Sequence, residues 1–187
     1  MALLSKSEKR PVTGEELFRR PDLEPCELVE GKIVPMSPTG FLHGDIEMEL
    51  GTALRAWARE TKRGRVVAGE VGIYVHRDPD TVRAADLLYI SHERLAGRTP
   101  SGYLDVPPEL VVEILSPDDR WNDVMEKLAE YFEAGVDRVW VVSPKLRSAF
   151  AYRSLSESRQ LGEGDSLCDE QILPGFSFPV VSLFQAD

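Results

Sequence analysis

The segment ELVVEILSP, residues 109–117, decides how the rest of the sequence is interpreted. Aliphatic residues surround Glu113 on both sides, in a run typical of a strand that is covered on both faces: Leu110, Val111, Val112, Ile114 and Leu115. An ionised carboxylate in such surroundings costs several kcal/mol unless it is paired. The segment therefore predicts a buried β-strand in which Glu113 is held by a cation or by another polar group.

The flanking segments predict alternating helices and strands. Apolar residues recur at helical spacing over about residues 41–61 and 119–134, and Gly135 follows in a C-cap position. Thr13 and Glu16 have the spacing of a capping box at the start of a short helix. Further strands are expected on both sides of the turn at residues 30–31, on both sides of residues 77–81, and over 138–143 and 148–154. Because strand, helix and strand follow one another over 109–143, we expect an α/β fold with a mixed sheet flanked by helices.

The length of 187 residues fits one domain. We expect residues 1–12 to form a flexible N-terminal arm and residues 13–187 to form a single domain. Its C-terminal segment, from about residue 154, is rich in loop-forming residues, and its apolar residues are expected to pack back onto the body of the domain.

The net charge of −10 argues against non-specific binding of nucleic acid. A local basic cluster is either a small DNA-facing patch or ordinary solvated surface: Arg55, Arg59, Lys62, Arg63 and Arg65. The apolar stretch in MALLSKSEKR is shorter than a signal peptide is expected to have, no apolar run reaches about 18 residues, and Cys26 and Cys168 lie far apart. These features favour a cytoplasmic protein without a disulfide.

A second acid, Asp86, also lies within an apolar strand pattern, VRAADLLYI. Two carboxylates on neighbouring strands repel each other unless a proton or a cation lies between them. Mg²⁺ prefers oxygen ligands and commonly binds one or two protein carboxylates. Asp86 and Glu113 are therefore candidate metal ligands. The alternatives are a buried salt bridge for Glu113 and backbone amides as the partners of Asp86.

Lys127 is the third candidate, because it lies beside the apolar face of the helix that follows Glu113. From there its ammonium group is expected to reach the ends of the preceding strands, where it would orient a water molecule or stabilise charge on a phosphate. The alternative is a surface ion pair between Asp123 and Lys127, which is worth only a few tenths of a kcal/mol.

Five segments together carry a resemblance to a known family: CELVEGKIVPMSP (26–38), LHGDIEMELGTAL (42–54), AAD (84–86), PPELVVEILSP (107–117) and DVMEKLAEYFEAGVDRVWVVSP (123–144). Over about residues 13–153 the chain resembles the Uma-type restriction endonuclease family of the PD-(D/E)xK nuclease superfamily. The resemblance implies a restriction-endonuclease-like core and a hydrolase that cleaves phosphodiester bonds, usually in DNA, with Mg²⁺ as cofactor and Mn²⁺ as a substitute. A homodimer is expected because a duplex has two strands to cut.

The resemblance also implies roles for single residues. The superfamily's motif Asp corresponds to Asp86 and its motif Glu to Glu113, whereas Ala85 stands where the motif has proline and Leu115 where it has lysine. Lys127 is the expected replacement for that lysine. Accessory candidates are His43, Glu27 and Glu70. A different class of function remains open: a catalytically inactive nuclease-fold protein that serves as a binding or assembly module.

Overall fold

The computed structural model describes residues 10–20, 22–23, 25–98 and 101–185. The helices are α1 (Gly14–Phe18), α2 (Phe41–Thr61), α3 (Trp121–Ala134) and a C-terminal 3₁₀ helix, η1 (Val180–Phe184). The strands are β1 (Cys26–Val29), β2 (Lys32–Pro35), β3 (Gly64–His76), β4 (Thr81–Ser91), β5 (Leu110–Ile114), β6 (Arg138–Ser143), β7 (Ser148–Ser154), β8 (Glu157–Leu161), β9 (Ser166–Leu167) and β10 (Phe178–Pro179). Most of the predicted N-terminal arm, residues 1–9, lies outside the described residues.

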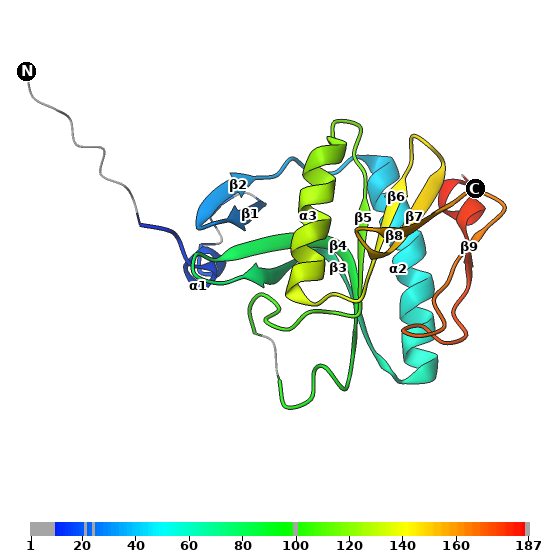
Figure 1. Cartoon of the computed structure of the whole chain (residues 1–187), viewed down its shortest axis with the longest axis horizontal. Coiled ribbons are helices and arrows are strands. Elements are labelled where there is room, and N and C mark those ends of the chain that lie inside the picture. The colour runs from blue at the N-terminus through cyan, green and yellow to red at the C-terminus, as the bar shows by residue number, and fades with distance from the viewer. Residues whose placement is uncertain (1–9, 21, 24, 99–100, 186–187) are drawn as a thin grey trace, which may run out of the picture.

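One mixed sheet forms the centre of the molecule (Figure 1). Its strand order is β2-β1-β4-β5-β6-β7-β8, and β3 pairs with β4 along the other edge of β4. The pair β5–β6 is parallel, as the intervening helix α3 requires, and the other pairs are antiparallel. The predicted α/β class with a mixed sheet flanked by helices is confirmed.

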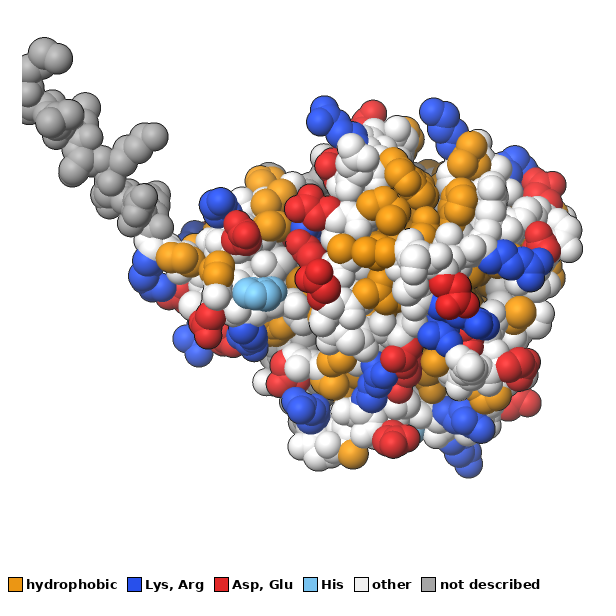
Figure 2. Space-filling model, viewed as in Figure 1, with side chains coloured by type: hydrophobic (Ala, Val, Ile, Leu, Met, Phe, Trp, Pro, Cys, Tyr) orange, Lys and Arg blue, Asp and Glu red, His pale blue; other side chains and the backbone are white. Residues whose placement is uncertain are grey.

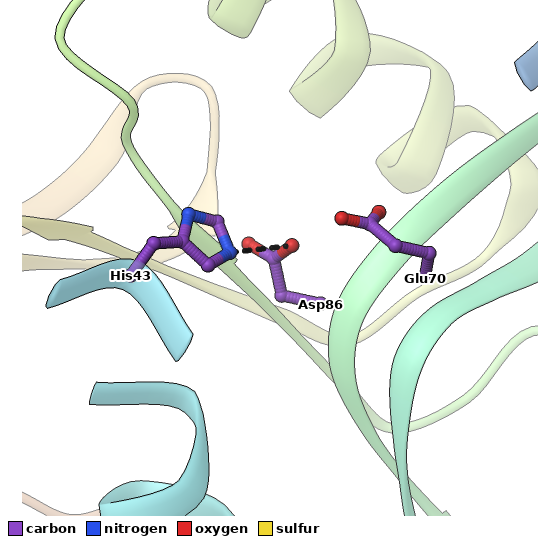
Figure 3. Close-up of side chains that lie close together, drawn as sticks. All are labelled: His43, Glu70 and Asp86. Carbon is purple, nitrogen blue, oxygen red and sulfur yellow. Dashed lines mark ion pairs between the residues drawn. The ribbon is translucent and has the colours of Figure 1, made fainter. Parts of the chain in front are cut away.

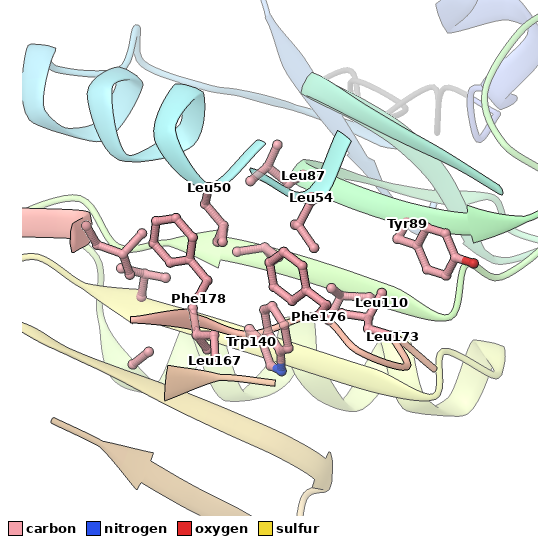
Figure 4. Close-up of a cluster of buried hydrophobic side chains, with 14 of the residues drawn as sticks. Leu50, Leu54, Leu87, Tyr89, Leu110, Trp140, Leu167, Leu173, Phe176 and Phe178 are labelled. Atoms are coloured by element: carbon pink, nitrogen blue, oxygen red, sulfur yellow. The ribbon is translucent and has the colours of Figure 1, made fainter. Parts of the chain in front are cut away.

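Helices α2 and α3 cover opposite faces of this sheet. The apolar side of α2, with Leu50 and Leu54, packs in one core with Leu110 and Trp140 of the sheet (Figure 4). On the other face, Leu128 of α3 lies in a second core. Both faces of β5 are thus covered, which explains its unbroken apolar run.

The C-terminal segment packs onto the α2 side of the sheet, as expected from its apolar residues. Leu173 and Phe176 are buried in the same core as α2 (Figure 4), and Val180 belongs to that core as well. The segment contains three strands that the sequence did not predict: β9 and β10, which pair with each other in a separate two-stranded sheet, and β8, which pairs with β7 at the edge of the main sheet. Four of the five residues of β8 are exposed and polar, so no alternation of apolar residues marks it.

Local signals account for the helix ends. Thr13 and Glu16 form the predicted capping box of α1, and Gly135 ends α3 in the left-handed conformation. Helix α3 begins two residues later than predicted, because the carboxylate of Asp119 accepts the Ser116 N–H at 2.7 Å and holds a turn there. Both cysteines are free thiols. Among the described residues, no helix combines the length and apolar character needed to cross a bilayer.

Candidate active site

Strand β4 has a gap in its pairing on the edge that faces β1 and β5. It pairs with β1 at Val82 and with β5 from Leu87 onward. Between these points, side chains replace a neighbouring strand: the Ala84 N–H donates to Glu27 Oε1 at 2.9 Å, and Lys127 Nζ donates to the Ala84 carbonyl at 2.7 Å. Buried backbone groups need partners, so the gap fixes the positions of both charged side chains.

Strands β4 and β5 diverge beyond the pair Leu87–Val112, and we call this point the fork. Asp86 lies at the fork and connects the two strands there. The last paired residues are Leu87 and Val112, and the Ile114 N–H beyond them donates to Asp86 Oδ2 at 2.6 Å. The carboxylate is therefore held by the backbone of the neighbouring strand. This is one of the arrangements considered from the sequence, and it leaves the second oxygen of Asp86 for another partner.

Glu113 is buried, with 8% of its surface exposed, and both of its carboxylate oxygens accept hydrogen bonds. Lys127 Nζ donates to Oε2 at 2.7 Å, and the Tyr131 hydroxyl donates to Oε1 at 2.8 Å. Lys127 also lies 3.2 Å from Glu27 Oε1, so its three protons face Glu113, Glu27 and the Ala84 carbonyl. The partner of Glu113 in the structure is thus the ammonium group of Lys127, which corresponds to the salt-bridge alternative considered from the sequence; a metal shared with Asp86 stays a prediction.

Burial dominates the electrostatics of this pair. It raises the pKa of Glu113 to about 8, against the attraction of Lys127, and the nearby Asp86 adds to the rise. Burial also lowers the pKa of Lys127, but the carboxylates of Glu113 and Glu27 outweigh it, so the net pKa is raised. Burial thus favours the neutral form of Glu113, whereas the neighbouring carboxylates favour the charged form of Lys127.

A second group of ion pairs, between Arg83, Glu27 and Glu130, adjoins the Lys127–Glu113 pair. Arg83 donates to Glu27 Oε2 at 2.7 Å and to Glu130 Oε1 at 2.9 Å. Burial raises the pKa of Glu27, but Lys127 and Arg83 outweigh it and the net pKa is lowered. Glu27 consequently links Arg83 to Lys127. Arg83, Glu130 and Tyr131 were not predicted as site residues from the sequence. The signal for Arg83 is a charge directly before AAD, and the signal for Glu130 and Tyr131 is their position three and four residues after Lys127, on the same side of the helix.

His43, Glu70 and Asp86 converge from three elements, α2, β3 and β4 (Figure 3). His43 Nε2 lies 3.1 Å from Asp86 Oδ1, and one ligand atom from each residue lies within 4.8 Å of the others. Glu70 occupies a β-bulge between Ala68 and Val71 and has a φ of 55°, which takes it out of the pleat of β3.

The carboxylates of this cluster influence one another. Burial raises the pKa of Glu70 to about 7, and the charge of Asp86 adds to the rise. Burial lowers the pKa of His43, but the carboxylates of Asp86, Glu70 and Glu47 more than offset it, so the net pKa is raised. A cation placed among these groups would relieve the repulsion between the two acids.

The structure thus brings the predicted residues into two groups that meet at the fork. Glu113, Lys127 and Glu27 form one group, and Asp86 with His43 and Glu70 forms the other. The cluster with metal-ligand spacing among the described residues contains Asp86 but not Glu113. The roles of these residues in catalysis and metal binding stay predictions.

The surface around the site offers no continuous basic stripe on the face that carries α3. Acidic and basic side chains are intermingled there around apolar patches (Figure 2). The five residues of the basic cluster are exposed and lie at or just beyond the C-terminal half of α2. At 1.5 Å per residue, Arg59 lies about 24 Å along the helix from His43. The cluster is therefore not next to the fork.

A surface cavity of about 560 Å³ lies elsewhere, lined by Tyr74, Arg77 and Tyr103 among others. Among the described residues that line it, none is a predicted site residue.

Comparisons with known proteins identify a family and a shared fold. The model of the Uma2 family, described as "Putative restriction endonuclease", matches residues 15–181. A crystal structure of a putative nuclease belonging to DUF820 from Anabaena variabilis superimposes with a TM-score of 0.77 at 21% sequence identity. The superposition covers 93% of this chain and 98% of that one. No curated protein matches the sequence. At this identity the structural likeness establishes the shared fold.

Proposed function

Because the chain belongs to the Uma2 family of putative restriction endonucleases, we propose that it is a metal-dependent endonuclease that hydrolyses phosphodiester bonds in DNA. The family and the structural neighbour support a nuclease function. The observation that carries the proposal is the arrangement at the fork between β4 and β5. There Asp86 accepts a hydrogen bond from the backbone of β5, and Lys127 of α3 donates to Glu113 and to the backbone of β4.

Asp86 and Glu113 would hold Mg²⁺, since each carboxylate keeps lone pairs beyond its present hydrogen bonds. The bound cation would supply Lewis acidity and a more acidic water. Lys127 keeps Glu113 oriented and carries a positive charge. Its longest contact, 3.2 Å to Glu27, is the one most easily exchanged for a substrate phosphate or an attacking water.

We take DNA as the substrate from the family, and cytoplasmic location and a homodimer remain part of the proposal. The net charge of −10 means that phosphate contacts must be local, because the whole protein repels a polyanion. Binding is therefore expected to weaken steeply with salt and to be helped by the cation at the fork.

The test is cleavage of supercoiled plasmid with Mg²⁺ or Mn²⁺, with EDTA as the metal-free control. Asp86→Asn is the sharpest variant, because asparagine can still accept the Ile114 N–H while losing the charge. Lys127→Met is compared with Lys145→Met, an exposed lysine on the loop after β6. Metal-dependent cleavage that is lost in Asp86→Asn and Lys127→Met but kept in Lys145→Met supports the proposal.

The second candidate is a nuclease-fold module that binds without cleaving. It is favoured by the full occupation of the Lys127 protons by Glu113, Glu27 and the Ala84 carbonyl, which leaves none free for substrate. Absence of cleavage on plasmid DNA, single-stranded DNA and RNA, together with metal-independent binding of a partner, would favour this module over the enzyme.

A further inference from the structure

We infer that His43, Glu70 and Asp86 form a second cation position at the fork, which selects a first-row transition metal over Mg²⁺. The inference rests on the proposed function only in that Asp86 is shared with the catalytic metal. It assigns a distinct ligand set, on the α2 side of the fork, and a distinct chemical class of cofactor.

The geometry fits a cation without rearrangement of the backbone. The three ligand atoms lie within 4.8 Å of one another, and the side chains point toward a common centre (Figure 3). Ligands on opposite sides of a metal at about 2.1 Å lie about 4.2 Å apart. Small rotations of the three side chains therefore suffice to bring all of them into coordination.

The state of His43 is the independent observation that points to a ligand. Its side chain is 7% exposed, yet within the described part of the chain neither ring nitrogen has a well-aligned hydrogen-bond partner. Nε2 is close to Asp86 Oδ1, at 3.1 Å, but the approach does not have hydrogen-bond geometry. Buried polar atoms are nearly always satisfied, so a buried imidazole with one ion-pair contact to a carboxylate and no aligned hydrogen bond on either nitrogen suits a metal ligand.

A β-bulge, and not regular strand pairing, places Glu70 beside His43 and Asp86. The bulge at Ala68–Val71 takes Glu70 out of register with β4 and leaves it half-buried. No hydrogen bond from the described residues reaches its carboxylate, although Glu47 nearby accepts the Gly69 N–H at 2.8 Å. A free carboxylate opposite Asp86 is repelled by it and gains from a shared cation.

The donor set decides the class of metal. Mg²⁺ is a hard cation that takes oxygen ligands and retains its waters, whereas an imidazole nitrogen suits first-row transition metals. One nitrogen and two carboxylate oxygens thus favour Mn²⁺ and the metals that follow it in the affinity series. Because Asp86 also faces Glu113's strand, the cation here would lie beside the catalytic one, as in two-metal hydrolases.

Mn²⁺ is the probe, because bound and free Mn²⁺ are distinguished by electron paramagnetic resonance. Binding is titrated to the full chain, and bound Mn²⁺ is competed with Mg²⁺. Pulsed resonance then detects nitrogen coupling from a directly coordinated imidazole. We expect such coupling. We also expect that Mg²⁺ displaces the bound Mn²⁺ only when the Mg²⁺ concentration exceeds the Mn²⁺ concentration about tenfold or more.

His43→Gln and Glu70→Gln are the variants, and His92→Gln is the matched control, an exposed histidine in the loop after β4. In His43→Gln the nitrogen coupling should vanish and the Mn²⁺ affinity should fall about tenfold or more. Glu70→Gln should lower the affinity while keeping the coupling, and His92→Gln should change neither. Circular dichroism and urea unfolding confirm that each variant is folded.

The outcomes separate this inference from the nuclease proposal. Mn²⁺ bound without nitrogen coupling, coupling that survives in His43→Gln, or equal competition by Mg²⁺ would overturn the second position even if plasmid is cleaved. Conversely, nitrogen coupling that depends on His43, in a protein that cleaves neither DNA nor RNA, would establish the second cation position and refute the proposed nuclease activity.

Discussion

Replacing Glu113 with glutamine should stabilise the metal-free protein while abolishing the proposed activity. Burial raises the pKa of Glu113 from its ordinary value of 4.5 to about 8, so ionising this carboxyl in the folded protein is unfavourable. A group whose pKa is raised on folding contributes its stability below the unfolded pKa and loses it as the pH rises toward the folded pKa. The relevant window therefore runs from about pH 4.5 to about pH 8.

The magnitude follows from that window. With a pKa of about 8 in the folded protein, Glu113 is expected to hold most of its proton at pH 7, whereas the unfolded chain has released it. The distance between pH 7 and 4.5, at about 1.4 kcal/mol per pH unit, gives about 3 kcal/mol of lost stability. Glutamine has no proton to take up and is close in shape. Its carbonyl can accept from Lys127 while its amide donates to the Tyr131 oxygen, so most of this free energy should be recovered.

The assay is urea unfolding in EDTA at a series of pH values from 4 to 8, with Glu126→Gln as control, an exposed acid on the same helix as Lys127. The free energy of unfolding of Glu113→Gln should exceed that of the unaltered protein by about 2–3 kcal/mol at pH 7, and the difference should shrink toward zero near pH 4. If Glu113→Gln is instead the less stable protein at pH 7, Glu113 is ionised there and its pair with Lys127 stabilises the fold, which refutes the reasoning.

Three further outcomes are expected from the same network. Lys127→Met should destabilise the protein by about 3–5 kcal/mol, because it leaves Glu27 and the Ala84 carbonyl without their partner, and the loss is measured by urea unfolding. Arg83→Met should also destabilise by several kcal/mol, since it leaves the carboxylate of Glu27 short of one buried cation; a change within about 0.5 kcal/mol would mean that Lys127 alone suffices. Metal affinity should rise between about pH 6 and 8, because the Glu70 carboxyl, whose pKa is raised to about 7, must release its proton to bind; a flat profile in calorimetry would contradict its role as a ligand.

The elements with strong local signals were predicted well. The capping box of Thr13 and Glu16, the full extent of α2 and the parallel β5–β6 unit all follow from spacing within a short stretch of sequence. The exposed strand β8 was missed because an edge strand with polar residues on both faces has no periodic pattern to recognise.

Two residues of the candidate site could be recognised because each conflicts with its own surroundings. Glu113 and Asp86 stand out because each is an acid within an apolar strand, and the structure places both at the fork. Arg83 gives no such signal, because its partners Glu27 and Glu130 lie on β1 and α3, far away in the sequence. Glu70 lies near Asp86 because a β-bulge reorients the Glu70 side chain. The regular alternation of side chains along a strand, with its period of two residues, does not predict such a bulge.

The arrival of the ammonium group from a helix, where the superfamily motif has a strand lysine, has a simple geometric basis. Residues two apart on a strand face the same side, so Glu113 and Leu115 both face α3. Leu115 packs against the core beneath that helix, and Lys127 approaches Glu113 from the helix itself, at 2.7 Å. The same ammonium group also satisfies the Ala84 carbonyl in the gap of β4. A lysine on the helix therefore keeps the charge beside Glu113, keeps Leu115 for packing, and makes the backbone of the fork depend on the residue to which the proposal assigns the positive charge of the site.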